Sequence, residues 1–294
     1  MAKQYYYFIA SLPAISMDDN KLVYNPEQFR KEAKTQLKET DYRLLLLLHL
    51  LDELANLLKV LYGIEIESED DSLFDAGYWQ EFIALAKQRL SNPNVQFPDQ
   101  YSILPAFVLA FVCELINLED LPPFLDAEHK ILQKFFAYCA KHQNRFIKEW
   151  FELERNIRNI LVAINGRNHK LEYAKYLIGD DYMVKNLSQS HAADFGLGKE
   201  HPLFDSVFRI WEQNDILYRE RGYDILRNKW IDDQNFFDYF NINRLLGYYS
   251  KLRIIHRWLT ADAELGKEVF HDTLNKLENS FEFPEDFNIK IKQK

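Results

Sequence analysis

The chain has 294 residues, enough for a sizeable core and for about two domains. Its residues are 47% hydrophobic and 15% aromatic, with only 9 Gly and 9 Pro, which excludes a disordered, collagen-like or linker-dominated chain and favours helix. The net charge of −9 argues against a broad phosphate-binding surface, so we do not expect nucleic acid as a partner.

The cysteines, the N-terminal segment and the apolar stretches predict where in the cell the chain is located. Cys113 and Cys139 lie in apolar helical patterns without zinc-ligand spacing, which predicts a cytoplasmic chain with reduced core thiols. The N-terminal segment is too short in apolar residues to be a secretory signal. The most hydrophobic stretches, 44–61 and 103–113, are interrupted by charge or too short for a span of about 20 apolar residues. We therefore expect no membrane span.

The first part of the chain opens with an aromatic segment, Tyr5 to Leu12, which fits a short strand or the start of a helix. Asn25-Pro26 is typical of a helix N-terminus, and the charged run that follows predicts a helix to Thr40. Leucines at intervals of three and four predict an amphipathic helix from Leu44 to Leu61.

An acidic run follows this helix. Six acids occur without an intervening base, and no glycine stands where a calcium loop of the EF-hand type needs one, so we expect a solvated loop rather than a cation site. The acids are Glu65, Glu67, Glu69, Asp70, Asp71 and Asp75.

The remainder of the chain is predicted to be helical with few interruptions. Asp120-Leu121-Pro122-Pro123 is the strongest boundary signal in the first half. The segment 179–202 is polar and contains glycines, so it is predicted as loops and short helices. The predicted helices are 76–90, 103–118, a long helix through Phe146 that ends at Asn165-Gly166, a helical region 203–260 with breaks near Gly222 and Asp232-Asp233, and 265–279.

No motif indicates chemistry. The 8 histidines are scattered without metal-ligand spacing. Gly196-Leu197-Gly198-Lys199 lacks the first glycine and the Ser or Thr of a phosphate loop. Adjacent acids such as Asp180-Asp181 are typical of solvated helix ends. We expect no catalytic residue, cofactor or metal, and a helical enzyme with a dispersed site is an alternative.

One pattern recurs: a short polar phrase that introduces an apolar helix. It begins at Thr40, at Leu153 and, more loosely, at Asn241. The unequal intervals argue against a solenoid of fixed repeats and favour three divergent helical lobes.

The second and third phrases carry a family resemblance. The second phrase provides an acid, an Asn-Ile pair, an Ile-Leu-x-Ala segment and a glycine, at Glu154, Asn156, Ile157, Ile160, Leu161, Ala163 and Gly166. Downstream stand His201-Pro202-Leu203, Glu212-Gln213-Asn214-Asp215-Ile216 and Tyr223-Asp224-Ile225-Leu226. Over residues 150–260 the chain resembles the C subunit of V-type (A/V-type) ATPases, called subunit d in eukaryotes.

The sequence also departs from that pattern. Val162 stands where the family has Arg, and Asn241 and Arg244 replace the acid and the Asn in the third phrase. The aromatic opening Tyr5-Tyr6-Tyr7 with Leu12-Pro13 is most similar to a bacterial family of unknown function that is encoded beside V-type ATPase subunits.

The resemblance implies a mainly α fold with three related helical lobes in a funnel of pseudo-threefold arrangement. We expect approximate lobes at 1–121, 122–200 and 201–294, which could interleave. It further implies a non-catalytic central-stalk rotor subunit that couples the rotating shaft to the membrane ion-translocating ring. The expected partners are the shaft and ring subunits, and the expected location is cytoplasmic, peripheral to the inner face of the membrane through the complex.

Arginines on the second and third lobes are the candidate partner-binding residues, although each could instead be an ordinary solvated charge or form an intramolecular ion pair. They are Arg155, Arg158, Arg167, Arg244, Arg253 and Arg257. The 17 Tyr and 22 Phe leave a second reading open, a helical adaptor that binds a peptide or protein partner.

Overall fold

The structure, a computed structural model, describes residues 5–66, 71–198 and 201–280, with the backbone alone over 262–280. Helices dominate, and the described residues contain no strand, which confirms the mainly α class. The α-helices are α1 (Tyr6–Ser11), α2 (Pro26–Gln36), α3 (Glu39–Leu47), α4 (Leu50–Leu61), α5 (Ala76–Ser91), α6 (Ala106–Ile116), α7 (Phe124–Ala140), α8 (Arg145–Asn168), α9 (Tyr182–Gln189), α10 (Pro202–Trp211), α11 (Ile216–Gln234) and α12 (Ile242–Ser280), with 3-10 turns η1 (Asp99–Ile103) and η2 (Ala174–Tyr176).

Side-chain caps start several of these helices. Asn25 and Gln28 form a reciprocal capping box at α2, as the Asn25-Pro26 pair predicts. Asp75 caps α5, Asn144 caps α8 and Asp215 caps α11, each by accepting a hydrogen bond from a backbone N–H of the first turn. The polar phrases between apolar runs therefore fix where the helices begin.

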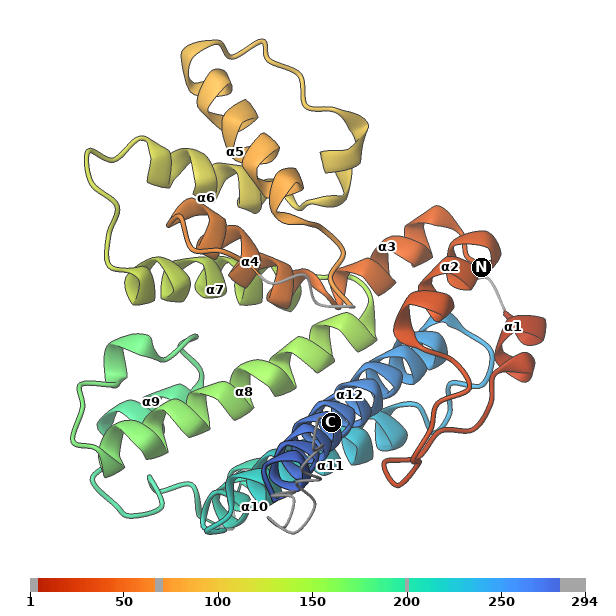
Figure 1. The fold of residues 1–294 in the computed structure, drawn as a ribbon. Helices are drawn as coiled ribbons and strands as arrows, with labels where there is room; N and C mark the ends of the chain where they lie inside the picture. The colour runs from red at the N-terminus through yellow and green to blue at the C-terminus, as the bar shows by residue number, and fades with distance from the viewer. Residues whose placement is uncertain (1–4, 67–70, 199–200, 281–294) are drawn as a thin grey trace, which may run out of the picture.

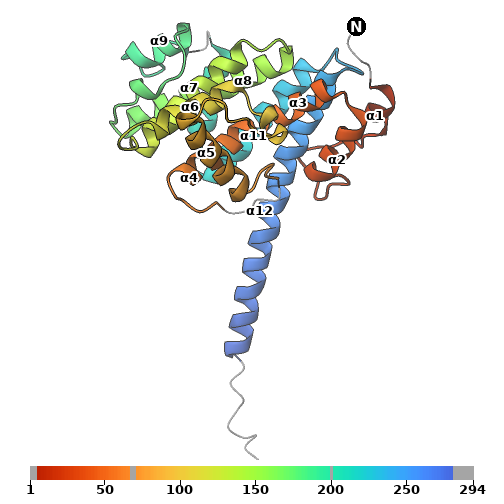
Figure 2. The same cartoon turned by 90° about the horizontal axis from the view of Figure 1, so that it is seen from above.

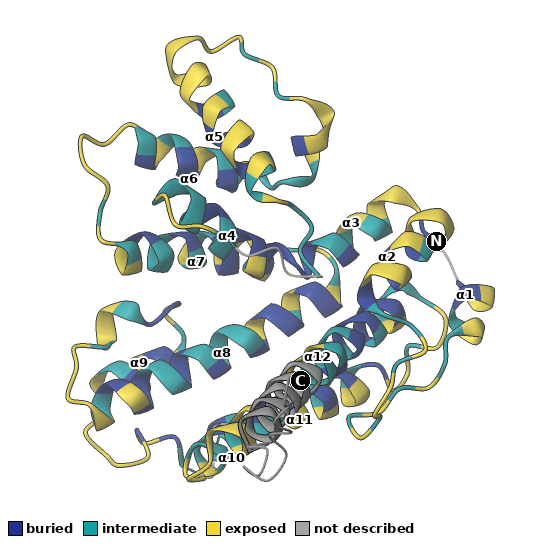
Figure 3. Cartoon of the chain, viewed as in Figure 1, coloured by how far each residue is buried: buried dark blue, intermediate teal, exposed yellow. Residues whose placement is uncertain are grey.

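The helices pack in groups around α8 and α12 (Figure 1). Helices α4, α5, α6 and α7 pack together, and α7 lies along α8. The helix α8 also contacts α9, α10 and α12. The helix α12 is packed by α2, α3 and α11. Figure 3 shows buried residues on α7, on α8 and on the part of α12 that lies within the body.

The packing of the helices can be compared with the expected boundaries of the three lobes. The turn at Asp120–Pro123 joins α6 to α7, and these two helices pack in the same group, so the expected boundary at 121 falls inside that group. The N-terminal α2 packs on α12, which joins the two ends of the described chain. The pseudo-threefold funnel and the three ranges stay predictions.

The long helix α12 has two parts. Its first part is buried in the body, where Leu245, Leu246, Tyr249 and Leu252 are inaccessible to solvent. Figure 2 shows that the rest of the helix leaves the body and projects from it. Within the part of the chain that the structure describes, no helix combines the length and apolar character needed to cross a bilayer.

Of the two alternatives for Tyr5 to Leu12, the structure has the helix, since Tyr6–Ser11 forms α1. Other local expectations are wrong. The predicted helix from Leu44 to Leu61 breaks at Leu48-His49, where the Leu48 carbonyl accepts a hydrogen bond from Arg253 on α12 at 3.1 Å. Gly166 does not end α8, which continues to Asn168.

Candidate functional site

The first feature of interest is a buried polar cluster where α2, α4 and α12 meet. We call it the Asp71 network: Arg30, His49, Asp71, Tyr249 and Arg253. Asp71 accepts hydrogen bonds from Arg30 and from Arg253, the latter at 2.6 Å. Arg253 also pairs with Asp52 on α4 at 2.7 Å. Asp71 is thus a structural ion-pair partner, whereas the sequence predicts a solvated loop residue there; residues 67–70 lie outside the described chain.

The uncharged members of this network, His49 and Tyr249, form a hydrogen bond that fixes which ring nitrogen of His49 carries the proton. Burial, and then the charges of Arg253 and Arg30, hold the pKa of His49 well below its usual value, so the ring is neutral. Arg30 donates to the Tyr249 hydroxyl at 3.0 Å, which leaves that hydroxyl able to donate to Nε2 of His49. The ring proton then lies on Nδ1, the nitrogen 3.9 Å from Asp71.

A second cluster lies where α8, α11 and α12 meet. We call it the Asp224 network: Glu154, Asp224, Arg227, Arg257 and Trp258. Asp224 is 1% exposed and accepts hydrogen bonds from Arg227 at 3.1 Å, from the Trp258 indole at 2.7 Å and from Arg257. Glu154 on α8 accepts two hydrogen bonds from Arg227, at 2.7 and 3.0 Å. The buried carboxylate is therefore fully compensated.

The two networks clamp α12 from two sides. Arg253 ties the helix to α4 and to Asp71, while Arg257, one turn later, ties it to α11. Both arginines precede the last part of α12, and Figure 2 shows that this helix projects from the body. The projecting part of the helix is thus fixed at its base by ion pairs to separate helices.

The candidate arginines on α8 contact the segments that follow this helix in the chain. Arg155 pairs with Asp181, the cap of α9, at 2.6 Å. Arg158 donates to the Tyr176 carbonyl at 3.0 Å, and burial lowers its pKa. Arg167 donates to the Ser190 and Ala192 carbonyls and stacks over the Phe195 ring at 3.4 Å. Arg155 thus makes an intramolecular ion pair, the alternative that the sequence left open, while Arg158 and Arg167 donate to backbone carbonyls.

Arg244 differs from the other five. Its side chain is exposed, and within the described residues it forms no hydrogen bond or ion pair. Among the six arginines it is the one whose guanidinium is available at the surface without an internal role.

The motif residues of α8 have packing roles. Ile157, Ile160 and Ala163 are buried in the core. Gly166 lies against Tyr173, and a Cβ there would overlap the Tyr173 side chain, which explains a glycine in mid-helix. Asn159, which the sequence analysis missed, is fully buried and exchanges hydrogen bonds with both backbone groups of Ile178. An amide on the buried side of an amphipathic helix is the signal that could have identified it.

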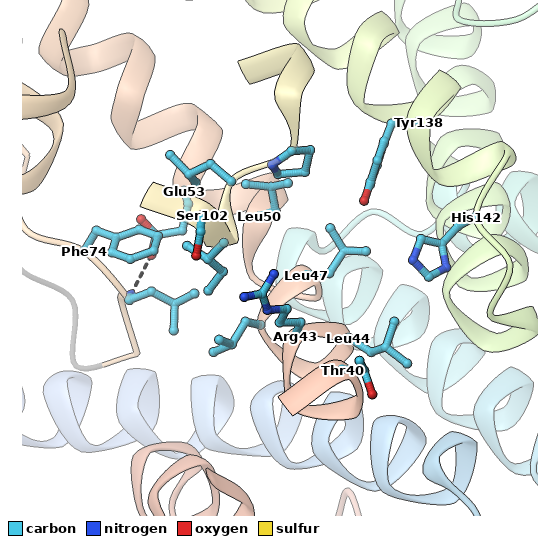
Figure 4. A pocket seen from close by; sticks show the side chains of 15 residues that line it. Thr40, Arg43, Leu44, Leu47, Leu50, Glu53, Phe74, Ser102, Tyr138 and His142 are labelled. Atoms are coloured by element: carbon cyan, nitrogen blue, oxygen red, sulfur yellow. Dashed lines mark hydrogen bonds between the residues drawn. The ribbon is translucent and has the colours of Figure 1, made fainter. Parts of the chain in front are cut away.

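A cavity of about 300 Å³ lies between α3, α4, η1 and α7 (Figure 4). Figure 4 shows Tyr138 and His142 on one side of it and Glu53 with Phe74 on the other. Burial raises the pKa of Glu53 to about 7, against the opposing hydrogen bond from the Leu73 N–H at 2.6 Å. The rest of the wall is mainly leucine, with the polar side chains of Thr40, Arg43 and Ser102, and Glu53 is the only acid among the residues that line it.

The other sequence candidates for chemistry fall outside any assembled site. Cys139 is buried and Cys113 is half-buried, and burial raises the pKa of both thiols, which disfavours the thiolate form. Gly196 and Gly198 both have positive φ and belong to a turn after α9. Across the described residues, His, Cys, Asp and Glu side chains do not gather in a group that could hold a metal ion.

Comparison with known proteins gives one result. The family described as "Protein of unknown function (DUF2764)" has a model that matches residues 1–281. No curated protein and no solved structure matches the chain.

Proposed function

The chain belongs to the DUF2764 family, whose function is unknown, and we propose that it is a non-catalytic central-stalk rotor subunit of a V-type ATPase. In this role it couples the rotating shaft to the membrane ion-translocating ring, at the cytoplasmic face. It has no active site or cofactor of its own. The motifs between residues 150 and 260 are the sequence support for this proposal.

One observation supports it from the structure. The helix α12 is clamped by Arg253 and Arg257 to different helix groups and then projects from the body (Figure 2). A coupling subunit has to pass force from one contact surface to another without yielding, and a helix anchored by hydrogen-bonded ion pairs, one of them to the buried Asp224, meets that need. The networks also join helices distant in sequence, so a load on α12 reaches α2, α4, α8 and α11.

The test is co-purification from the protein's own host. The tagged full chain should recover V-type ATPase shaft or ring subunits, and Arg253→Ala combined with Arg257→Ala should lower the ratio of ion transport to ATP hydrolysis in the assembled enzyme. Arg209→Ala is the matched control, because Arg209 forms only an exposed pair with Asp205 within α10. Recovery of unrelated proteins without ATPase subunits would refute the rotor role.

That outcome would favour the second candidate, a helical adaptor. Its specific support is a set of exposed aromatic side chains around α1 and the α11–α12 turn, with Tyr7 at 93% and Phe237 at 80% exposure. Large exposed apolar patches on soluble domains are typical of protein–protein contact sites.

A further inference from the structure

The α1 end of the molecule carries an aromatic surface beside a cavity. Six rings are exposed there to 36% or more: Tyr6, Tyr7, Phe236, Phe237, Tyr239 and Phe240. The two segments that carry them are in contact, because the Tyr5 N–H donates to the Phe240 carbonyl at 2.7 Å and the Tyr6 and Phe240 rings lie 4.5 Å apart. Figure 2 places α1 and the start of α12 at the opposite end from the projecting half of α12.

A cavity of about 330 Å³ adjoins this aromatic surface. One wall comes from Ile9 on α1 and the segment Leu12–Ile15, and the other from α11 and the first turns of α12. The same elements carry the exposed rings, since Phe236 directly follows Asn235 of the cavity wall. The wall from α1 and the segment after it is apolar and suits an apolar side chain, whereas the opposite wall is mainly polar.

Two buried polar groups of the residues that line the cavity lack a hydrogen-bond partner. Asn235 is 3% exposed, and its Oδ1 has no hydrogen-bond partner in the described chain. The buried Tyr248 hydroxyl also lacks a partner there, and burial raises its pKa to about 12, so it stays a donor. Unpaired buried polar groups cost free energy that a bound partner could recover.

Among the charged side chains that line the cavity, one positive charge has no acidic partner within the described residues. Lys251 pairs with Asp232, so these two lining charges offset each other. Arg244 also lines the cavity, and its exposed guanidinium has no partner among the described residues. The site therefore offers the exposed Arg244 guanidinium to a carboxylate. The Tyr248 hydroxyl and the Asn235 oxygen are shielded from solvent in the free chain, so a partner reaches them only if docking opens the cavity.

We infer that this aromatic surface and its cavity are a docking site for a segment of a partner protein that carries an apolar side chain beside an Asp or Glu. The peptide backbone supplies the N–H for Asn235, the carboxylate accepts from Arg244 and Tyr248, and the six rings cover the flanking residues. A fatty acid would satisfy the cation but not the Asn235 oxygen. The inference concerns a different surface from the α12 clamp and holds with or without the rotor role.

The test uses photo-crosslinking of the full chain in its own host. A benzophenone amino acid replaces Phe237, and the matched control replaces Tyr182 on α9, which is 67% exposed and lies on another part of the molecule. We expect one host peptide, enriched at position 237 over position 182, with an Asp or Glu next to an apolar residue. Arg244→Glu should reduce the adduct about tenfold, Arg244→Lys much less, and reversal of the partner's acid to Lys should restore it with Arg244→Glu.

Several outcomes overturn the inference: adducts with lipid, adducts with a second copy of the chain, a crosslinked peptide without an acid, no peptide enriched over position 182, or a yield that Arg244→Glu leaves unchanged. Equal thermal midpoints of wild type and Arg244→Glu exclude unfolding as the cause of a loss. The rotor role is judged separately by which subunits co-purify with the wild-type chain.

Discussion

Asp224 shows how one buried charge can fix several helices. It is 1% exposed and accepts hydrogen bonds from side chains on α11 and α12. Asp224→Asn keeps the shape but removes the acid that pairs with Arg257 and one of the two acids that pair with Arg227, so we expect a loss of about 2 kcal/mol in unfolding free energy. Urea denaturation measures it. Asp205→Asn, in an exposed pair with Arg209, should cost less than about 1 kcal/mol, and equal losses would contradict the internal role of Asp224.

Glu53 should make stability depend on pH. Burial raises its pKa from the usual 4.5 to about 7, so the native state holds a proton that the unfolded state has released between these values. The stabilisation is fully present below pH 4.5 and is lost as pH rises through about 7, a difference of about 3 kcal/mol.

Denaturation curves from pH 5 to pH 8 measure this dependence. Glu53→Gln should remove most of the slope, while Glu152→Gln, an exposed position on α8, should retain it. A wild-type slope unchanged by Glu53→Gln would show that another group is responsible.

The site residues were only partly predictable at this scale. The sequence selects arginines on α8 and α12, but it does not show that Arg155 faces Asp181 or that Arg257 faces Asp224, because those partners are 26 and 33 residues away. Asp71 looks like one acid in a run of six, and its pairing with Arg253, 182 residues later, is a property of the tertiary structure.

At the scale of elements, local sequence signals predict which segments are helical, whereas tertiary contacts determine where several helices begin and end. The predicted helix 76–90 agrees closely with α5, and Asp75, which the sequence presents only as the last acid of the acidic run, caps this helix at its start. The break at Leu48-His49 has no local signal, since it serves Arg253 and Tyr249 on α12. Gly222 was predicted as a break, yet it lies within α11, where the absence of a side chain allows Ile210 of α10 to approach.

The Asn144 side chain connects α8 to α12, and substitution of this residue tests whether the connection contributes to stability. Its Oδ1 caps α8 by accepting from Ile147 N–H at 2.9 Å, and its Nδ2 donates to Asn243 at the start of α12 at 2.9 Å. Asn144→Ala loses both bonds, so we expect a loss of about 1–2 kcal/mol, and Asn144→Ser, which keeps a capping oxygen, should lose less. Hydrogen exchange should rise in the first turns of α8 and α12 together. Faster exchange in α8 alone would show that the contact with Asn243 contributes nothing.

For the whole molecule, α12 provides an axis with two distinct ends. Its start lies beside the aromatic surface, its middle is clamped by the Asp71 and Asp224 networks, and its last part projects (Figure 2). Sequence periodicity predicted helix on both sides of Thr260 but not that a single helix continues through Ser280. This continuity connects the body to the projecting segment without a hinge.

The arrangement predicts that the body folds without the projecting segment. A chain that ends after Ala261 keeps Arg253, Arg257 and Trp258, so we expect its thermal midpoint to stay within about 2 °C of the full chain, with less helical signal in circular dichroism. A chain that ends after Ser250 loses the contacts of these three residues with α4, α11 and Asp71 and should be unfolded or lose the cooperative transition. If the longer truncation product also unfolds, the distal part of α12 is a structural component of the body rather than an extension from a fixed base.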